Sequence, residues 1–272
     1  MAQIRTITHS SSGASCTVSD FGATVLSFKT GSGQDCLFVS RDAKLDGSKA
    51  VRGGIPLVFP QFGQPDKSMP QHGFLRNNFW MVDEASAYDN EDSAGISYTI
   101  GLVDAKNSRG GKWDKETDLD CSCVYSIKIE AEKMTTTIEI KNTSEKSFDF
   151  QTLQHTYYMV DNHSALDSSQ CFVKGLAGYS VIDKVTGAKY VLGGDPVSID
   201  GSVDRIYNPP SGKDVVDVVI GIGSGKTMKM TAIGTLDGSP VPVSCVVWNP
   251  YKENAAKMSD FGDDQVNSSI RL

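Results

Sequence analysis

The stretch at residues 121–142, "CSCVYSIKIEAEKMTTTIEIKN", repeats with a period of two. Every second residue from Cys123 to Ile129 is apolar or aromatic, and polar or charged side chains such as Lys128 lie between them. After a short break, the same period returns from Met134 to Ile140. Because successive side chains of a strand point to opposite faces of a sheet, the stretch predicts two half-buried antiparallel strands joined as a hairpin.

Shorter segments of the same kind recur on both sides of this hairpin, separated by turn clusters such as "LGGDP" and "YNPPSGKD". They are "GISYTIGLV", "KSFDFQTLQHTYYMV", "VVDVVIGIG", "KTMKMTAIG" and "PVSCVVWNP". Helical periodicity is nearly absent, and the best candidate is a short helix within residues 249–258. Many strands with few helices predict an all-β fold, a large antiparallel β-sandwich or barrel. The chain contains no linker-like tract, so we expect a single domain over residues 1–272.

Composition limits the classes of function. The chain has 272 residues, 39% of them hydrophobic, and a net charge of -7. A nucleic-acid-binding protein needs an extended basic surface, which this charge disfavours. A small anionic ligand needs only a few local cations and remains possible. Without a long apolar run or the apolar core of a signal peptide, we expect a cytoplasmic protein that has no membrane partner. We also expect no nucleic-acid partner and a monomer.

Several common catalytic and metal-binding motifs are missing. The six cysteines contain no CxxC pair and lie in strand-like surroundings, which predicts reduced thiols in the core. The four histidines lack the HxxxH spacing of a helical zinc site, so no metal site is expected. The segment "GSGKT" resembles the end of a phosphate-binding loop, but Ile220 stands where that loop needs a glycine. A glycine-rich hairpin turn is the better interpretation.

Two arginines lie in an unusual stretch, residues 51–80, "VRGGIPLVFPQFGQPDKSMPQHGFLRNNFW". Arg52 precedes two glycines, which let the backbone turn tightly or approach a ligand, and Arg76 follows "PQHGFL". The guanidinium group matches the oxygens of a phosphate and stays charged at physiological pH. Surface salt bridges are the ordinary alternative, but the surrounding Pro, Gly and Phe residues indicate an ordered, packed loop.

Two further residues could carry chemistry. His155 lies within the predicted strand "FDFQTLQHTYYMV", and an imidazole is the natural proton donor near neutral pH. The alternative is an ordinary core or surface histidine. Asp204, in "GSVDRIYNPP", is either a turn aspartate or a carboxylate that accepts hydrogen bonds from a polyhydroxylated ligand.

Taken together, the segments resemble the glucose-6-phosphate 1-epimerase (hexose-6-phosphate mutarotase) branch of the aldose 1-epimerase family. The resemblance is carried, in order along the chain, by "RGGIPLVFPQFG", "PQHGFLRNNFW", "LQHTYY", "VDRIY", "VVWNP" and "MSDFGDD". It implies the large antiparallel β-sandwich, called a supersandwich, of these enzymes. It also implies interconversion of the α and β anomers of a hexose 6-phosphate, glucose 6-phosphate first, by acid and base catalysis and without a metal or organic cofactor.

The resemblance also assigns roles to residues. Arg52, Gln71 and Arg76 would bind the sugar phosphate, His72 would contact the sugar, and His155 would be the general acid. Asp204 would bind sugar hydroxyls.

One part of the family pattern is not matched within the chain. The family's base is a glutamate on a strand that follows "DFGDD", and by count it would fall at or just after Leu272. Asp263 and Asp264 are nearby carboxylates, but a predicted turn is a poor place for a substitute base. Two interpretations follow: the sequence is a shortened record of an active enzyme, or the protein is a non-catalytic sugar-phosphate-binding protein on the same fold.

Overall fold

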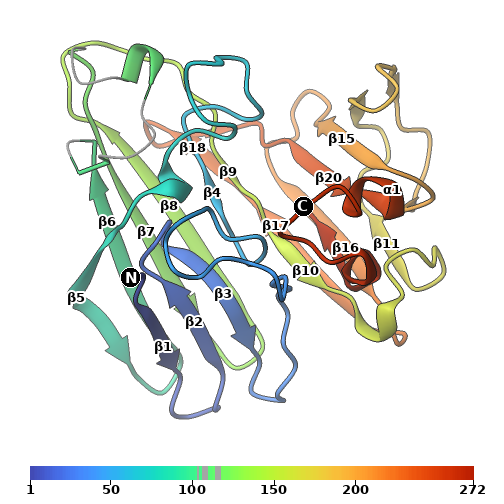
Figure 1. The fold of residues 1–272 in the computed structure, drawn as a ribbon, viewed down its shortest axis with the longest axis horizontal. Coiled ribbons are helices and arrows are strands. Elements are labelled where there is room, and N and C mark those ends of the chain that lie inside the picture. The colour runs from blue at the N-terminus through green and yellow to red at the C-terminus, as the bar shows by residue number, and fades with distance from the viewer. Residues whose placement is uncertain (103, 106–109, 114–117) are drawn as a thin grey trace. The chain divides into compact units, whose positions relative to one another are not determined.

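The computed structural model describes residues 1–102, 104–105, 110–113 and 118–272. The chain forms two compact units, one of residues 1–39 and 43–156 and the other of residues 40–42 and 157–272. Antiparallel strands dominate both units (Figure 1), which confirms the prediction of an all-β fold. The expectation of a single domain stays a prediction.

The first unit contains a three-stranded sheet in the order β1-β2-β3, a four-stranded sheet in the order β5-β6-β7-β8, and a short pair, β4 and β9. The elements of the described residues are β1 (Ile4–Thr8), β2 (Ser15–Ser19), β3 (Thr24–Lys29), β4 (Leu57–Val58), the 3-10 turn η1 (Leu75–Asn77), β5 (Met81–Asp89), β6 (Ala94–Gly101), the 3-10 turn η2 (Gly111–Trp113), β7 (Cys121–Ile129), β8 (Met134–Asn142) and β9 (Leu153–Gln154). The predicted strand "GISYTIGLV" is therefore confirmed as β6, and its last residue, Val103, lies outside the described residues.

The hairpin predicted from residues 121–142 is confirmed as β7 and β8. The two strands pair from Cys121 opposite Asn142 to Ile129 opposite Met134. On β7 every second side chain is buried, from Cys121 to Ile129, and the residues between them are partly or fully exposed. The apolar residues of the two-residue repeat on β7 are thus the ones on the buried face of this sheet.

An aromatic cluster lies beside β4 and helps to fix the backbone around it. The buried ring of Trp113 packs against Phe148, Phe59 and Phe74, with centroid distances of 4.7, 5.3 and 6.0 Å. The pairs meet edge to face, which is the favoured geometry for aromatic rings. Since Phe59 and Phe74 flank the loop of residues 60–73, this cluster anchors both ends of that loop.

The second unit contains a six-stranded sheet in the order β10-β21-β20-β15-β12-β13, a four-stranded sheet in the order β14-β11-β16-β17, and the hairpin β18-β19. Its elements are β10 (Tyr157–Met159), the 3-10 turn η3 (Asp161–His163), β11 (Cys171–Lys174), β12 (Ser180–Asp183), β13 (Lys189–Val191), β14 (Val197–Ser198), β15 (Val203–Asn208), β16 (Val216–Ile222), β17 (Thr227–Ala232), β18 (Gly234–Leu236), β19 (Ser239–Val241), β20 (Cys245–Asn249), α1 (Tyr251–Ala255), the 3-10 turn η4 (Asp263–Ser268) and β21 (Ser269–Arg271).

The two larger sheets of this unit share one apolar core. Strands of both sheets contribute side chains to it, among them Val173, Val181, Tyr207, Ile220, Val247 and Ile270. Such packing of two antiparallel sheets face to face is the sandwich arrangement expected from the sequence.

Three smaller predictions concern this unit. The short helix within residues 249–258 is confirmed as α1. The "GSGKT" segment is confirmed as a hairpin turn, because β16 and β17 pair directly on either side of it. All six cysteines are buried and reduced, as expected. Burial raises the pKa of the Cys16, Cys171 and Cys245 thiols to about 12, so these side chains stay protonated and unreactive at neutral pH.

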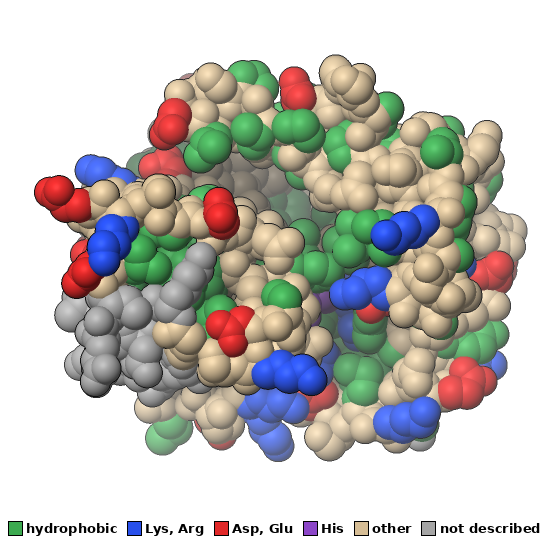
Figure 2. All heavy atoms as spheres, turned by 90° about the horizontal axis from the view of Figure 1, so that it is seen from above, with side chains coloured by type: hydrophobic (Ala, Val, Ile, Leu, Met, Phe, Trp, Pro, Cys, Tyr) green, Lys and Arg blue, Asp and Glu red, His purple; other side chains and the backbone are tan. Residues whose placement is uncertain are grey.

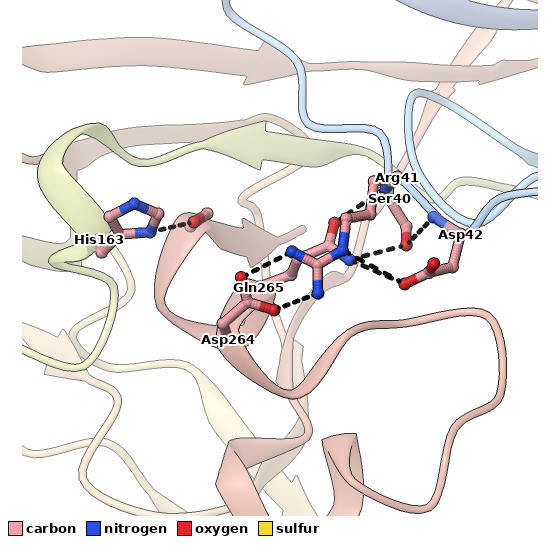
Figure 3. A network of polar contacts seen from close by, with 7 residues as sticks. Ser40, Arg41, Asp42, His163, Asp264 and Gln265 are labelled. Carbon is pink, nitrogen blue, oxygen red and sulfur yellow. Dashed lines mark hydrogen bonds and ion pairs between the residues drawn. The ribbon is translucent and has the colours of Figure 1, made fainter.

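A polar network ties residues 40–42 to η4 within the second unit (Figure 3). The Arg41 guanidinium donates two hydrogen bonds to the Asp264 carboxylate, at 2.6 and 2.7 Å. The buried amide of Gln265 accepts the N–H of Arg41 at 3.0 Å and donates to the side chains of Ser40 and Asp42, both at 3.3 Å. Gln265 thus satisfies both ends of its amide on a single short segment.

Acidic and basic side chains are interspersed with apolar ones on the face shown in Figure 2. Within the described residues, none of the helices has the length and apolar character required to span a bilayer.

Candidate functional site

Strand β4 brings together three segments of the first unit. Leu57 and Val58 pair with Gln154 and Leu153 of β9. The residue that follows β4, Phe59, forms a bridge with Gly73. The loop that carries Gln71, His72 and Arg76 follows β4 directly, and the segment that carries His155 follows β9, the strand paired with β4.

His155 lies at a break between two strands and not inside one, so the prediction of a continuous strand over "FDFQTLQHTYYMV" is wrong. Strand β9 ends at Gln154 and β10 begins at Tyr157. The N–H of His155 donates to the carbonyl of Pro56 at 3.0 Å, whereas Tyr157 pairs with β21 in the other unit. The change of partner strand ends the ladder at His155. The hydrogen bond to Pro56 holds the backbone of His155, and its side chain is half-buried.

Gln154 fixes the direction in which this segment faces. Its side-chain oxygen accepts hydrogen bonds from the hydroxyls of Thr136 at 2.6 Å and Tyr125 at 3.4 Å, and its NH2 group donates to the carbonyl of Thr136 at 3.3 Å. Gln154 therefore points at β7 and β8. His155 follows Gln154 directly, outside the strand. The sequence gives no signal for Gln154 beyond a polar residue in a strand.

His72 is held by Gly63 at two points. Its N–H donates to the carbonyl of Gly63 at 2.6 Å, and its ring nitrogen Nδ1 lies 3.1 Å from the N–H of the same glycine. The backbone of His72 has a φ of 67°, in the left-handed region that residues with a side chain seldom adopt. The ring packs against Phe62, with 5.2 Å between centroids. Backbone and ring of His72 are thus both fixed.

The structure brings the two predicted histidines together. The ring centroids of His72 and His155 are 5.6 Å apart, and the ring planes meet at 64°. Both side chains are half-buried. Two imidazoles at this distance can act on neighbouring atoms of one small substrate, and an imidazole can donate or accept a proton near neutral pH.

The two predicted arginines also belong to the first unit. Arg76 lies in η1, and its Nη2 donates to the carbonyl of Gln71 at 2.7 Å. Gln71 is exposed and precedes His72 directly, so the guanidinium group of Arg76 lies close to the backbone of the histidine loop. Arg52 is half-buried. The next residues, Gly53 and Gly54, run against the backbone of Val39 and Phe38.

Asp204 belongs to the second unit. It lies on β15, opposite Trp248 of β20, and not in the turn considered from the sequence. Burial raises the pKa of Asp204; the nearby Asp183 adds to this effect and Lys184 opposes it. A half-buried carboxylate on a strand is a rigid acceptor, which suits the binding of hydroxyl groups.

The Asp264 carboxylate forms an ion pair with Arg41. The hydrogen bonds from Arg41 hold the pKa of this exposed carboxyl below its usual value, which makes it a weaker base. This supports the expectation that Asp264 is a poor substitute for the glutamate base of the family. The side chain of Asp263 lies outside the described residues.

Gly73 is a sensitive position next to His72. It has a φ of +73°, and a Cβ built on it would lie 1.9 Å from the carbonyl oxygen of Phe59. We expect Gly73→Ala to lower the free energy of unfolding by about 2 to 4 kcal/mol, because backbone strain and a clash with backbone both add to the cost. Gly13→Ala is the matched control, since Gly13 has a φ of +76° but nothing within 4 Å of the added atom. Urea unfolding should show a loss of about 1 kcal/mol for the control, and equal losses in both variants would contradict the close approach.

Comparison with known families agrees with this architecture. The model of the family described as aldose 1-epimerase matches residues 4–269. A curated protein of Cenchrus ciliaris, named "Putative glucose-6-phosphate 1-epimerase", is 29% identical over 253 residues, which are 92% of this chain and 71% of that protein. A protein of the same name from Escherichia coli K12 is 26% identical over 245 residues, 89% of this chain and 73% of its own length.

Solved structures show the same fold. The crystal structure of a "putative mutarotase" from Salmonella typhimurium aligns with a TM-score of 0.78 and 21% identity over 99% of this chain and 81% of that chain. A galactose mutarotase-like protein from Clostridium acetobutylicum aligns with a TM-score of 0.61 and 15% identity over 99% of this chain and 87% of its own. The expected galactose mutarotase-like β-sandwich is thereby confirmed.

Proposed function

Because the chain belongs to the aldose 1-epimerase family, whose model matches residues 4–269, we propose that it interconverts the α and β anomers of glucose 6-phosphate. The observation that carries the proposal is the pair of imidazoles, His72 and His155, 5.6 Å apart on segments anchored to one strand. The relatives from Cenchrus ciliaris and Escherichia coli support the choice of substrate by their names.

The proposed reaction consists of proton transfers. A base takes the proton from the C1 hydroxyl while an acid protonates the ring oxygen, so the C1–O5 bond breaks and the open-chain aldehyde forms. Rotation about the C1–C2 bond and closure in reverse give the other anomer. His155 is the proposed acid, because an imidazole exchanges protons near neutral pH. Asp204 is proposed to accept hydrogen bonds from the sugar hydroxyls.

Arg76, Gln71 and Arg52 are proposed to hold the 6-phosphate. Arg76 donates to the carbonyl of Gln71, which keeps one edge of its guanidinium group in place. Guanidinium groups bind phosphate through paired, charge-assisted hydrogen bonds. A neutral hexose would give no such partner to the arginines, so the phosphorylated sugar is the better substrate. The chain is proposed to work in the cytoplasm as a monomer.

Anomer exchange measured by NMR tests the proposal. We expect the protein to accelerate exchange between the α and β forms of glucose 6-phosphate far above the rate in buffer, and to act less well on glucose. If exchange stays at the buffer rate while glucose 6-phosphate still binds, the chain is a sugar-phosphate-binding protein without catalysis.

The phosphate contact predicts a selective loss in Arg76→Ala. Removing one charged hydrogen-bonding partner should weaken binding of glucose 6-phosphate by about 10- to 100-fold, or roughly 1.5 to 3 kcal/mol. Binding of glucose should change little. Calorimetric titration with both sugars measures the difference, and Lys141→Ala, which removes an exposed cation from β8, is the control. An equal loss for the two sugars would rule out a phosphate role for Arg76.

A further inference from the structure

Four side chains of the second unit form a row across the six-stranded sheet. Asp204 of β15 pairs with Trp248 of β20, and Trp248 pairs with Arg271 of β21. Arg271 pairs in turn with Tyr157 of β10. Directly paired residues of neighbouring strands place their side chains on the same face of a sheet. The residue before Trp248, Val247, belongs to the apolar core of this unit, so the row lies on the face opposite that core.

The Arg271 guanidinium group holds the Trp248 ring in one orientation. Its Cζ atom lies 3.4 Å from the centroid of the Trp248 ring, and 4.1 and 5.1 Å from the centroids of Tyr157 and Phe261. A cation over the face of an aromatic ring is attracted to it, most strongly where water is excluded, and Arg271 is buried. One face of the indole is therefore covered. Since β20 lies between β21 and β15, the other face is turned toward Asp204.

The end of the row formed by Trp248 and Asp204 is open to solvent. Both residues are half-buried, whereas Arg271 and Tyr157 are buried. In the part of the chain that the structure describes, neither the indole N–H of Trp248 nor the Asp204 carboxylate has a hydrogen-bond partner, and both groups reach the surface. An apolar ring face, a hydrogen-bond donor and an acceptor thus lie next to one another, available to a ligand.

This combination suits the ring of a sugar. The C–H groups on one face of a pyranose form a small apolar surface that can pack on an aromatic ring, and its hydroxyls donate and accept hydrogen bonds. A phosphate group would fit poorly, because it would lie beside the carboxylate of Asp204 and like charges repel. The chemistry therefore selects the neutral ring of the sugar and not its phosphate.

We propose that Trp248 is a sugar-binding residue: the hexose ring packs on its open indole face, and the indole N–H donates to a sugar oxygen while Asp204 accepts a hydroxyl. This contact rests on the proposed function, since the ring is that of the substrate, and adds a residue that does not distinguish glucose 6-phosphate from glucose. Because Arg271 already holds the indole in place, packing of the sugar costs little side-chain entropy.

Tryptophan fluorescence tests the contact without any turnover. Of the three tryptophans, Trp80 and Trp113 are buried, with 3% and 0% of their surface exposed, so Trp248 is the one that a ligand and a soluble quencher reach. We expect saturating glucose 6-phosphate or glucose to change the emission and to protect it from quenching by acrylamide. Both effects should vanish in Trp248→Phe. Emission and quenching that do not respond to either sugar, or effects that persist in Trp248→Phe, would overturn the proposal.

Substitution of Trp248 should weaken the binding of both sugars alike. We expect Trp248→Leu to raise the Kd of glucose 6-phosphate and of glucose by about 10- to 50-fold each, because the stacking surface and the N–H donor are both lost. Trp248→Phe keeps an aromatic ring and should raise both by about 3- to 10-fold. Calorimetric titration measures the constants, and Tyr190→Leu, which removes an exposed ring from β13 of the same sheet, is the control. Unchanged binding in Trp248→Leu, or a loss confined to glucose 6-phosphate, would refute the contact with the sugar ring.

Anomer exchange separates this contact from the proposed function. If the parent accelerates exchange and Trp248→Leu keeps the KM of the parent, the epimerase function stands and the contact at Trp248 is refuted. If the sugars protect Trp248 from acrylamide while exchange stays at the buffer rate, the epimerase function fails and the contact stands.

Discussion

Replacing His155 with Gln should lower kcat for anomer exchange of glucose 6-phosphate by about 10² to 10⁴, the usual contribution of a general acid. Gln is close to His in size and can keep polar contacts, but it cannot deliver a proton. KM should change little, because the proton transfer to the ring oxygen is made only in the transition state. Exchange rates measured by NMR over a range of glucose 6-phosphate concentrations give kcat and KM separately.

The pH dependence of His155→Gln gives a second readout. A general acid must be protonated to act, so the activity of the parent should fall at the alkaline side of its pH profile, where the acid loses its proton. The variant should lack this limb. His163→Gln is the control, since that exposed histidine binds the Ser268 hydroxyl in the second unit. A kcat within a factor of a few of the parent would mean that the acid is another residue.

The sequence predicted best what short-range patterns determine. The alternation from Cys123 to Ile129 and from Met134 to Ile140 marked both strands of the β7–β8 hairpin, because the two faces of each strand differ in burial. Neighbouring strands joined by a short turn pair with each other, so their register follows from the turn. The same reasoning located β16 and β17 around the "GSGKT" turn.

Predictions that depend on distant partners were less accurate. Strand β9 pairs with β4, and β10 pairs with β21, so the break at His155 depends on residues far away along the chain. Asp204 was placed near a turn because of the prolines that follow, but β12 and β20 pair on both sides of β15 and extend it. Likewise, the contact between Nδ1 of His72 and Gly63 depends on the path of a whole loop. The family resemblance suggested His72 and His155, but only the coordinates show that their rings lie 5.6 Å apart.

The largest effect on stability is expected at Asp183, whose buried carboxylate binds the Nε of Arg205 at 2.9 Å across β12 and β15. It also accepts the N–H groups of Val185 and Thr186 at 2.9 and 3.0 Å. Asp183→Asn removes the charge and leaves the guanidinium group without its anion. We expect the free energy of unfolding at neutral pH to fall by about 3 to 5 kcal/mol, as when one partner of a buried ion pair is lost. Urea unfolding of parent and variant measures this difference.

The effect of Asp183→Asn should depend on pH in a direction that the contacts define. Burial opposes ionisation of Asp183, but the hydrogen bonds from Arg205, Thr186 and Val185 outweigh it and lower its pKa. A lowered pKa stabilises the folded state above the unfolded value of about 3.9 and loses this contribution as pH falls through the folded value. The difference in free energy of unfolding between the parent and Asp183→Asn should therefore become smaller below about pH 4.

Asp204→Asn should show the opposite trend. Burial raises the pKa of Asp204, so its ionisation disfavours folding as pH rises above about 4. Relative to the parent, Asp204→Asn should gain stability between acidic and neutral pH while Asp183→Asn loses it, and the same trend in both variants would contradict the charge assignments.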